Sequence, residues 1–289
     1  MCIRDSKGAI YSDIFGWDRA KWFSETFADE KYGFRRNNSF DAVCVECFSV
    51  RENVGLTELS SFAKFEVTGR DSTALLNRLS ANRIPQIDGQ VRLVHMLTKL
   101  GGIECELTVV RLSTERYYLL AGSVGEIHDF DWLSQYIETS EEVVVRNVTD
   151  DIAVLLLTGP SSRDVLSQIT NADLTNDHGF KWMTARSIMV SGILVRAVRV
   201  SYAGELGWEL HHKVDQSPLL FESLMAAGAS YGLRLFGTYA LNSLRMEKGY
   251  KAWGTDLTTE VSLVEAGMMQ FAKNNNNFIG SDILKAKHN

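Results

Sequence analysis

Two periodicities of apolar and polar side chains alternate along the chain. An apolar residue at every second position is typical of a strand with one buried face, and a spacing of three and four residues is typical of an amphipathic helix. In the first half, a helix that opens at residues 68–72 carries Leu75, Leu76 and Leu79 on one face. Strands are predicted around it at 63–67, 91–97, 104–112 and 117–121, and a second helix at 127–137. This half should therefore hold a sheet with two helices.

The second half of the chain repeats this order of elements. The segment FEVTGRDS at 65–72 is echoed by LLLTGPSS at 155–162. The apolar positions of the helices that follow align at the same offset, namely Leu75, Leu76 and Leu79 with Val165, Leu166 and Ile169. Strand-like segments within 187–210 and a helix at 219–231 complete the second copy. The repeat predicts an α+β fold of two related β-α-β-β-α halves with antiparallel sheets.

These patterns divide the chain into four predicted regions. Residues 1–40 are rich in aromatic and charged side chains with weak helical spacing, so we expect a surface-crossing connector from an upstream domain. Residues 41–145 and 146–270 are expected to form the first and second α+β halves. Residues 271–289 contain no visible closing element, and we interpret them as the start of a C-terminal domain that this sequence truncates.

Composition and charge narrow the possible partners. The 289 residues are 45% hydrophobic and 23% charged, which is typical of a folded protein. The net charge of -6 argues against nucleic acid or an anionic membrane as the main partner, because phosphate binding needs clustered Lys and Arg. The first residues lack the apolar stretch typical of a signal peptide, and no apolar run approaches the length of a membrane span, so we expect a reducing, cytoplasmic environment.

Cys44 and Cys47 form a CxxC motif. A zinc site would need a second ligand pair at comparable spacing, which the sequence does not contain. Residues 43–50 are predicted to be a strand in which both thiols fill ordinary packing positions. We therefore expect no metal site.

Common nucleotide-binding and hydrolase motifs are absent from the sequence. It contains neither GxGxxG nor GxxxxGK[ST], and its histidines do not have HExxH spacing. The GxSxG motif of serine hydrolases is also missing. The chain is therefore not expected to bind FAD, NAD or ATP through these motifs.

The stretch 200–211 has the strongest character of a binding site. Gly204 and Gly207 interrupt strand-like residues and give the backbone the freedom that a tight turn or a close ligand needs. Glu209 returns on a strand beside Trp208, where a carboxylate can reach a planar ligand. An isolated turn of this kind is more often a hairpin with solvated glutamates.

Further charged candidates lie on one strand and one helix. Glu104 and Glu106 share a face if 103–112 is a strand, because side-chain direction repeats every second residue. Arg245 lies among apolar residues of a helix predicted at 238–248, so we expect it to have a carboxylate partner. Each acid alone is more often a solvated side chain, and the coincidence of acids with glycine turns in both repeats favours a site.

Several ordered motifs resemble those of the aminomethyltransferase family, which includes the glycine-cleavage T-protein. They are VGLTELS at 54–60, MLT at 96–98, GGIECELTV at 101–109, the stretch 202–210, and LRMEKG at 244–249. Within the family, ELTV at 106–109, FAKF at 62–65 and an aromatic lead-in at 15–23 are most similar to the C-terminal folate half of FAD-dependent dimethylglycine and sarcosine dehydrogenases. The resemblance covers the chain from about residue 33 onwards.

This resemblance implies a fold and a ligand. The family fold is a cloverleaf of two related α+β domains and a small β-barrel around a central channel, and this chain would lack most of the barrel. Tetrahydrofolate binds in that channel and captures a one-carbon unit. Dehydrogenases of this type also carry an N-terminal flavin domain, so FAD is expected only in a domain absent from this chain.

The resemblance also assigns roles to four residues. Glu209 matches the glutamate that hydrogen-bonds the pterin, Tyr202 the tyrosine near the ring, and Arg245 the arginine of the folate site. Glu106 takes the place of the catalytic aspartate that orients the attacking folate nitrogen. The sequence departs from the T-protein pattern at Glu106, which has a longer side chain, and at Leu93, where the family often has a tyrosine.

The expected function is therefore a tetrahydrofolate-binding one-carbon transfer module of a dimethylglycine or sarcosine dehydrogenase, which forms 5,10-methylenetetrahydrofolate. Its expected partners are folate and an imine or formaldehyde derived from an N-methyl amine, together with a flavin domain. Two alternatives stay open: a free-standing aminomethyltransferase of the glycine cleavage system, and a non-catalytic folate-binding regulatory protein. In a eukaryote, the expected location would be the mitochondrial matrix.

Overall fold

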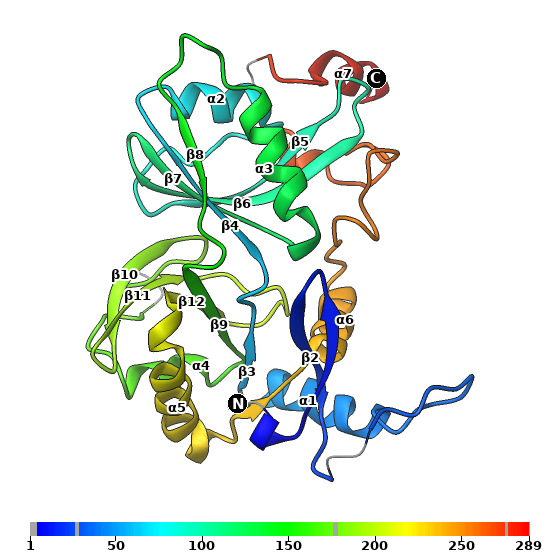
Figure 1. Cartoon of the computed structure of the whole chain (residues 1–289), viewed down its shortest axis with the longest axis vertical. Helices are drawn as coiled ribbons and strands as arrows, with labels where there is room; N and C mark the ends of the chain where they lie inside the picture. Colours follow the sequence, from blue (N-terminus) through cyan, green and yellow to red (C-terminus); the bar gives the residue numbers. More distant parts are fainter. Residues whose placement is uncertain (1–4, 27–28, 176–178, 275–276, 289) are drawn as a thin grey trace. The chain divides into compact units, whose positions relative to one another are not determined.

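The chain forms two compact units. The computed structural model describes residues 5–26, 29–175, 179–274 and 277–288. Unit 1 comprises residues 1–61, 150–182 and 186–250, and unit 2 comprises 62–149, 183–185 and 251–289 (Figure 1). These units differ from the regions predicted from sequence, because residues 41–61 group with the second repeat and residues from 251 onwards group with the first.

Unit 1 is built on a six-stranded sheet. The strand order is β10 (Ala185–Val190), β11 (Ile193–Val198), β12 (Gly207–Lys213), β9 (Ile152–Thr158), β3 (Gly55–Glu58) and β13 (Arg234–Leu235). Strand β12 runs antiparallel to β11 and β9, and β9 runs antiparallel to β3. Strand β13 extends the sheet in parallel with β3. The sheet therefore joins three segments that are distant in sequence.

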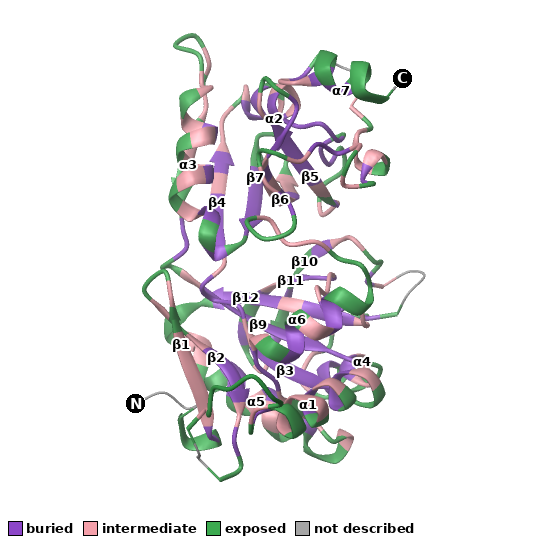
Figure 2. Cartoon of the chain, turned by 90° about the vertical axis from the view of Figure 1, so that its right-hand side faces the viewer, coloured by how far each residue is buried: buried purple, intermediate pink, exposed green. Residues whose placement is uncertain are grey.

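Helices α4 (Ser162–Ser167) and α5 (Ser217–Gly228) pack against one face of this sheet. Their buried residues Leu166 and Phe221 share a core with Trp208 and Leu210 of β12. Figure 2 shows the concentration of buried positions on β3, β9 and β12. The apolar alternation of β12 thus places one set of side chains in the core and the other set on the opposite face.

The remaining elements of unit 1 meet at one carboxylate. A hairpin of β1 (Ala9–Ile14) and β2 (Trp17–Phe23) contacts α1 (Phe40–Glu52) and α6 (Thr238–Glu247). Glu46 of α1 accepts hydrogen bonds from the backbone N–H of Phe23 at 2.7 Å and of Gly237 at 2.9 Å. Burial raises the pKa of Glu46 to about 7, while the two N–H donors act in the opposite direction. The N-terminal residues therefore include a well-packed hairpin, in which Trp22 is buried.

The strand predicted at residues 43–50 is wrong, because these residues lie in helix α1. The buried positions of this helix are Glu46, Ser49 and Val50, which follow helical spacing although two of them are polar. Cys44 and Cys47 are half-buried free thiols one turn apart. Tertiary hydrogen bonds to Glu46, which the local pattern does not encode, explain why apolar periodicity failed here.

Unit 2 is built on a five-stranded antiparallel sheet. Its order is β5 (Val91–Leu97), β6 (Ile103–Ser113), β7 (Arg116–Ala121), β4 (Ala63–Thr68) and β8 (Val144–Asn147). Helices α2 (Ser72–Leu79) and α3 (Glu126–Gln135) cover one face, with Leu75 and Leu133 in a common core with Leu107. Residues from 251 onwards add a smaller core and helix α7 (Ser281–His288).

Five short 3₁₀ helices connect these elements in the described residues. They are η1 (Asp5–Lys7), η2 (Ser123–Gly125), η3 (Val214–Gln216), η4 (Ala229–Tyr231) and η5 (Met269–Phe271). The asparagine run at 274–277, whose polar side chains predict a loop, lies partly outside the described residues.

The predicted repeat is present in the backbone. Gly69 and Gly159 have φ of 119° and 128°, values that favour glycine, and each C=O accepts a 3.0 Å hydrogen bond from the first residue of the next helix, Ser72 or Ser162. Leu76 and Leu166, at equivalent positions, are fully buried. The α+β fold is confirmed, and the described residues contain no barrel.

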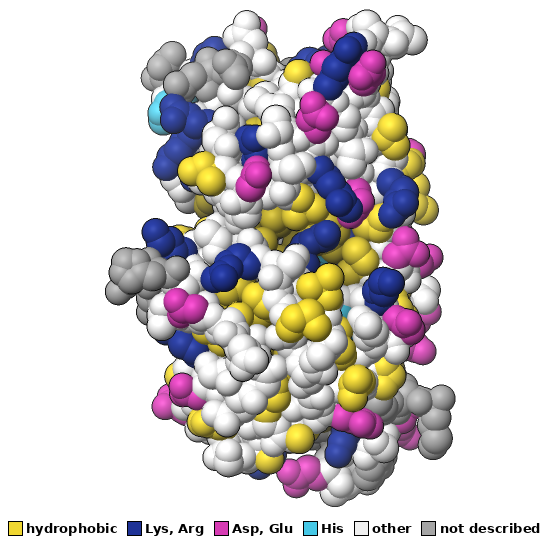
Figure 3. All heavy atoms as spheres, turned by 90° about the vertical axis from the view of Figure 1, so that its left-hand side faces the viewer, with side chains coloured by type: hydrophobic (Ala, Val, Ile, Leu, Met, Phe, Trp, Pro, Cys, Tyr) yellow, Lys and Arg dark blue, Asp and Glu magenta, His cyan; other side chains and the backbone are white. Residues whose placement is uncertain are grey.

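Within the described ranges, no helix combines the length and hydropathy that crossing a membrane requires. Figure 3 shows basic and acidic side chains interspersed with apolar ones on one face of the molecule.

Candidate functional site

Strand β6 presents two carboxylates on one face, as its alternation predicts. Glu104 and Glu106 are partly exposed, and they alternate with the buried residues Ile103, Cys105 and Leu107. Cys105 and Leu107 belong to the core beneath α2 and α3. The two glutamates therefore point to the sheet face opposite these helices.

Glu106 has a histidine partner on the neighbouring strand. His95 of β5 lies directly opposite Glu106 in the antiparallel register, and its Nε2 is 2.8 Å from Oε2 of Glu106. The imidazole is fully buried, whereas the Glu106 side chain is 16% exposed. The ring of His95 also packs against that of Phe271, with centroids 5.5 Å apart. The imidazole of His95 is thus enclosed by the protein, whereas the carboxylate of Glu106 can reach a ligand.

Glu104 belongs to a second cluster, around His128 at the start of α3. Its Oε1 lies 2.8 Å from Nε2 of His128, whose Nδ1 lies 2.9 Å from Oδ1 of Asp129. These carboxylates, Asp129 first, raise the pKa of His128 to about 9. The Trp253 ring packs 5.1 Å from the imidazole. The imidazole is therefore held in its protonated form between two acids.

Cys105, His128 and Asp129 are close enough to share a metal ion in the described part of unit 2. Burial raises the pKa of the Cys105 thiol, and both ring nitrogens of His128 already contact carboxylates. A metal would have to displace protons from both groups. The arrangement thus favours a protonated ion-pair cluster over a metal centre.

In unit 1, the glycine turn positions Glu209. Gly204 has a φ of 75°, and Glu205 pairs with Lys248 of the segment after α6 at 3.0 Å. Glu209 follows on β12, flanked by Trp208 and Leu210, which face the helices, so its side chain points to the opposite face of the sheet. It is 15% exposed, and its Oε2 lies 3.2 Å from Nε2 of the buried His211.

Tyr202 and Arg245 are linked through Tyr250. The rings of Tyr202 and Tyr250 stack with centroids 6.2 Å apart. Arg245 is buried in α6, where Nη1 donates to the carbonyl of Tyr250 at 2.8 Å and Nε donates to Asn242 Oδ1 at 2.8 Å. These two acceptors are neutral oxygens, and the carboxylate partner expected from the sequence stays a prediction. Tyr202, Glu209 and Arg245 all belong to unit 1, and Glu106 belongs to unit 2.

Three residues that contact the predicted site residues were not identified from the sequence, namely His211, His95 and Tyr250. His211 was accessible through the two-residue alternation that places it beside Glu209 on one face of β12. His95 could not be found by counting from the Gly101-Gly102 turn, because a register shift between Met96 and Leu97 moves its partner from Cys105 to Glu106. Tyr250 lies in the segment after α6, and no periodic signal in the sequence connects it with Tyr202.

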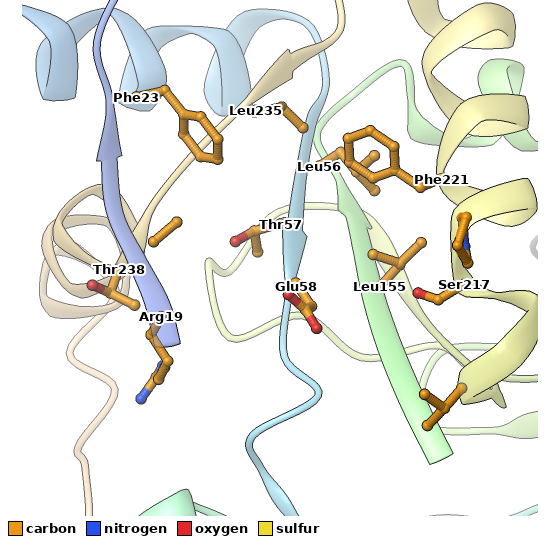
Figure 4. Close-up of a pocket in the computed structure, with 13 residues that line it drawn as sticks. Arg19, Phe23, Leu56, Thr57, Glu58, Leu155, Ser217, Phe221, Leu235 and Thr238 are labelled. Atoms are coloured by element: carbon orange, nitrogen blue, oxygen red, sulfur yellow. The ribbon is translucent and has the colours of Figure 1, made fainter. Parts of the chain in front are cut away.

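Unit 1 also contains a cavity of about 250 Å³ between β2, β3, β9 and α5. Its walls are mostly apolar, and Arg19 and Glu58 lie at one end of it in Figure 4, with Phe23 and Leu235 at the other. Burial lowers the pKa of Arg19, and the charge of Glu58 opposes this shift. The described residues that line the cavity do not include Tyr202, Glu209 or Arg245.

The fold and these ordered residues define a family. A family model described as the GCVT N-terminal domain matches residues 3–276, so the chain belongs to the glycine-cleavage T-protein (aminomethyltransferase) family. Mitochondrial dimethylglycine dehydrogenase of Mus musculus is 42% identical over 93% of this chain. The chain spans only 31% of that relative.

Two further comparisons agree with this family. An aminomethyltransferase of Anoxybacillus flavithermus is 32% identical over 85% of this chain and 67% of its own length. Among solved structures, the glycine cleavage system aminomethyltransferase T of Bartonella henselae matches with a TM-score of 0.82 and 22% identity, covering 99% of this chain and 73% of that one. The predicted family and fold are confirmed, and the four residue roles stay predictions.

Proposed function

We propose that this chain is the tetrahydrofolate-binding one-carbon transfer module of a protein like dimethylglycine or sarcosine dehydrogenase, and that it forms 5,10-methylenetetrahydrofolate. The similarity to mitochondrial dimethylglycine dehydrogenase supports this class. The single observation that carries the proposal is the partly exposed Glu209 on β12, which keeps one carboxylate oxygen free of any described hydrogen-bond partner. In a eukaryote, the same similarity favours the mitochondrial matrix.

The donor and acceptor chemistry around Glu209 fits a pterin. A pterin presents adjacent N–H donors, and a carboxylate can accept both in a directional, charge-assisted pair. His211 contacts Oε2 of Glu209 and fixes the carboxylate from the buried side. Tyr202 with Tyr250 supplies aromatic surface, and Arg245 holds the Tyr250 backbone in place. These residues are therefore assigned to folate binding.

Glu106 is assigned to the transfer step. Bound tetrahydrofolate supplies an amine nitrogen that forms a bond to a carbon at the oxidation level of formaldehyde, and the condensation releases water. A carboxylate beside that nitrogen orients it, takes up its proton and stabilises a cationic carbon. Glu106 suits this role because Oε2 is held by His95 while the side chain remains partly exposed.

Calorimetric titration with tetrahydrofolate tests the binding assignment. Glu209→Ala should weaken binding by about 10-fold or more, because it removes hydrogen bonds to a charged acceptor. Glu205→Ala is the matched control from the same turn, because its carboxylate pairs with Lys248, and it should bind folate like the wild type. Equal heats for the wild type and Glu209→Ala would refute the assignment.

The flavin expected in such dehydrogenases does not fit the described residues. Neither sheet is a parallel dinucleotide-binding sheet, and the sequence has no GxGxxG motif. No step of the reaction is therefore assigned to FAD in this chain. We propose that a flavin domain acts as a partner and produces the imine or formaldehyde that the folate module consumes.

A second candidate function is that of a free-standing aminomethyltransferase. The similarity to the aminomethyltransferase of Anoxybacillus flavithermus favours it. A transfer assay with an aminomethylated lipoyl carrier protein separates the two functions, because the dehydrogenase-type module should use formaldehyde and leave the carrier intact. Folate binding without transfer from either donor would instead support a regulatory folate-binding protein.

A further inference from the structure

We infer that His95 is a positioning residue, which holds the Glu106 carboxylate by one oxygen so that the other faces the reacting folate nitrogen. This inference rests on the proposed function for the role of Glu106, and it adds a residue to which the family resemblance gave no role. The sequence pattern had placed His95 only within a strand.

The strand pairing brings the two side chains together. His95 and Glu106 are directly opposed in the β5–β6 register, and side chains at opposed positions have Cβ atoms about 4.5–5.5 Å apart. Their contact of 2.8 Å between Nε2 and Oε2 thus follows from the backbone. Because the ring also packs against Phe271, its direction is fixed from two sides.

The surroundings of the imidazole determine its tautomer. Nδ1 of His95 is buried, and no described residue hydrogen-bonds to it. Burying an N–H donor without an acceptor costs more free energy than burying an unprotonated ring nitrogen. The proton of the imidazole therefore belongs on Nε2, which donates a hydrogen bond to Glu106. Oε1 of Glu106 has no hydrogen-bond partner among the described residues and remains available.

Stability alone does not account for this histidine. Glu106 is partly exposed and can be solvated, so it does not need a buried partner to be tolerated. An apolar side chain at position 95 would avoid the unsatisfied Nδ1 and would pack equally well against Phe271. A residue that breaks the packing rules in this way is expected where a reacting group must be held in one direction.

The test uses His95→Phe, which keeps a ring of similar size but removes the donor. The rate of 5,10-methylenetetrahydrofolate formation from tetrahydrofolate and formaldehyde is measured above the protein-free rate. His95→Phe should lower kcat on the order of 10- to 100-fold, while KM for tetrahydrofolate stays within about twofold of the wild type. Its urea unfolding midpoint should equal or exceed that of the wild type. His95→Gln places an amide donor near the position of Nε2 and should recover most of the lost rate.

Two further variants in unit 2, His128→Gln and Glu106→Gln, separate the possible explanations. His128→Gln is the matched control, because it removes the imidazole that contacts Glu104, two residues from Glu106 on β6, and it should leave kcat unchanged. Glu106→Gln reports on the proposed function itself. If Glu106→Gln reduces kcat and His95→Phe does not, the positioning role is wrong and the proposed function stands. If the wild type does not exceed the protein-free rate, the proposed function fails.

A readout without turnover completes the test. In nitrogen-15 spectra of the labelled protein, His95 should show a proton on Nε2 and a bare Nδ1, and Glu106→Gln should shift the Nε2 signal. A proton on Nδ1 instead would overturn the inference regardless of activity. A fall in kcat accompanied by an equal loss of stability in His95→Phe would also overturn it.

Discussion

In unit 2 the strand order β5-β6-β7-β4 matches β10-β11-β12-β9 in unit 1, with α2 and α3 in the places of α4 and α5. Both sheets carry a glutamate on the face opposite these helices. Glu106 lies on β6, however, whereas Glu209 lies on β12, the counterpart of β7. The backbone was repeated, but the candidate chemistry was not placed at equivalent positions.

The two glutamates are also held differently. Glu106 is held from a neighbouring strand by His95 at 2.8 Å, and Glu209 by His211, two residues further along its own strand, at 3.2 Å. A partner on another strand ties the carboxylate to the pairing of the sheet itself, whereas a partner on the same strand moves with it. This difference matches a transfer role for Glu106 and a binding role for Glu209.

The largest expected effect separates the two roles. Glu106→Gln should lower the rate of transfer to tetrahydrofolate about 100-fold or more, because an amide cannot take up the proton. Its dissociation constant for tetrahydrofolate should stay close to that of the wild type. Steady-state kinetics and calorimetry on the same preparation measure both quantities. Loss of folate binding in Glu106→Gln would mean that the acids of the two units share one role.

Substitutions at equivalent core positions of the two repeats should reduce stability by similar amounts. Leu76→Ala in α2 and Leu166→Ala in α4 each remove a fully buried side chain, and each should reduce the free energy of unfolding by about 3 kcal/mol. Urea unfolding measures the loss, and amide hydrogen exchange locates it in the substituted unit. Leu194→Ala on β11 is the exposed control, with an expected change below about 0.5 kcal/mol. If only one of the two substitutions caused a small loss of stability, the two core positions would not be energetically equivalent.

Glu46 gives unit 1 its own pH dependence. Its folded pKa of about 7 lies above the value of an unfolded glutamate, so its contribution to stability is present below about pH 4.5 and is lost as pH rises towards 7. The stability of the wild type relative to Glu46→Gln should therefore fall between pH 5 and 8, by at most about 3 kcal/mol. Urea unfolding at four pH values measures this difference. A difference that grows with pH would contradict the burial argument.

His128 gives unit 2 a weaker dependence at higher pH. Its pKa is raised to about 9, so its contribution to stability is present below about pH 6.5 and is lost as pH rises through 9. More than a third of the side chain is exposed, and we expect the effect to stay below about 1 kcal/mol. Thermal unfolding of the wild type and His128→Gln between pH 6 and 9.5 measures it. An advantage of the wild type that persists at pH 9.5 would exclude this cause.

The sequence was most informative where one local rule decides the structure. The alternation in β6 placed Glu104 and Glu106 on one face, and the matching TGRDS and TGPSS segments located both repeats. Helix α1 was not predictable in this way. Its buried residue Glu46 accepts hydrogen bonds from the backbone N–H groups of Phe23 and Gly237, which are distant in sequence. The same holds for His95, whose importance comes from strand pairing.

For a related reason, the sequence did not predict that each compact unit is built from separate segments of the chain. Strand β3 precedes the first repeat in sequence, but it pairs with β9 of the second repeat. Alternation predicts which face of a strand is buried and does not identify its neighbour. The predicted boundaries therefore followed chain order, whereas the compact units follow strand pairing.

The pairing of β3 with β9 has a consequence for synthesis on the ribosome. All five strands of the unit 2 sheet lie within residues 63–147, so this sheet can close before the second repeat has been made. Residues 55–58 emerge earlier, but they must wait for 152–158 and then 234–235. During this interval an apolar strand edge is exposed to other chains, and early binding by a chaperone should improve the yield of folded protein.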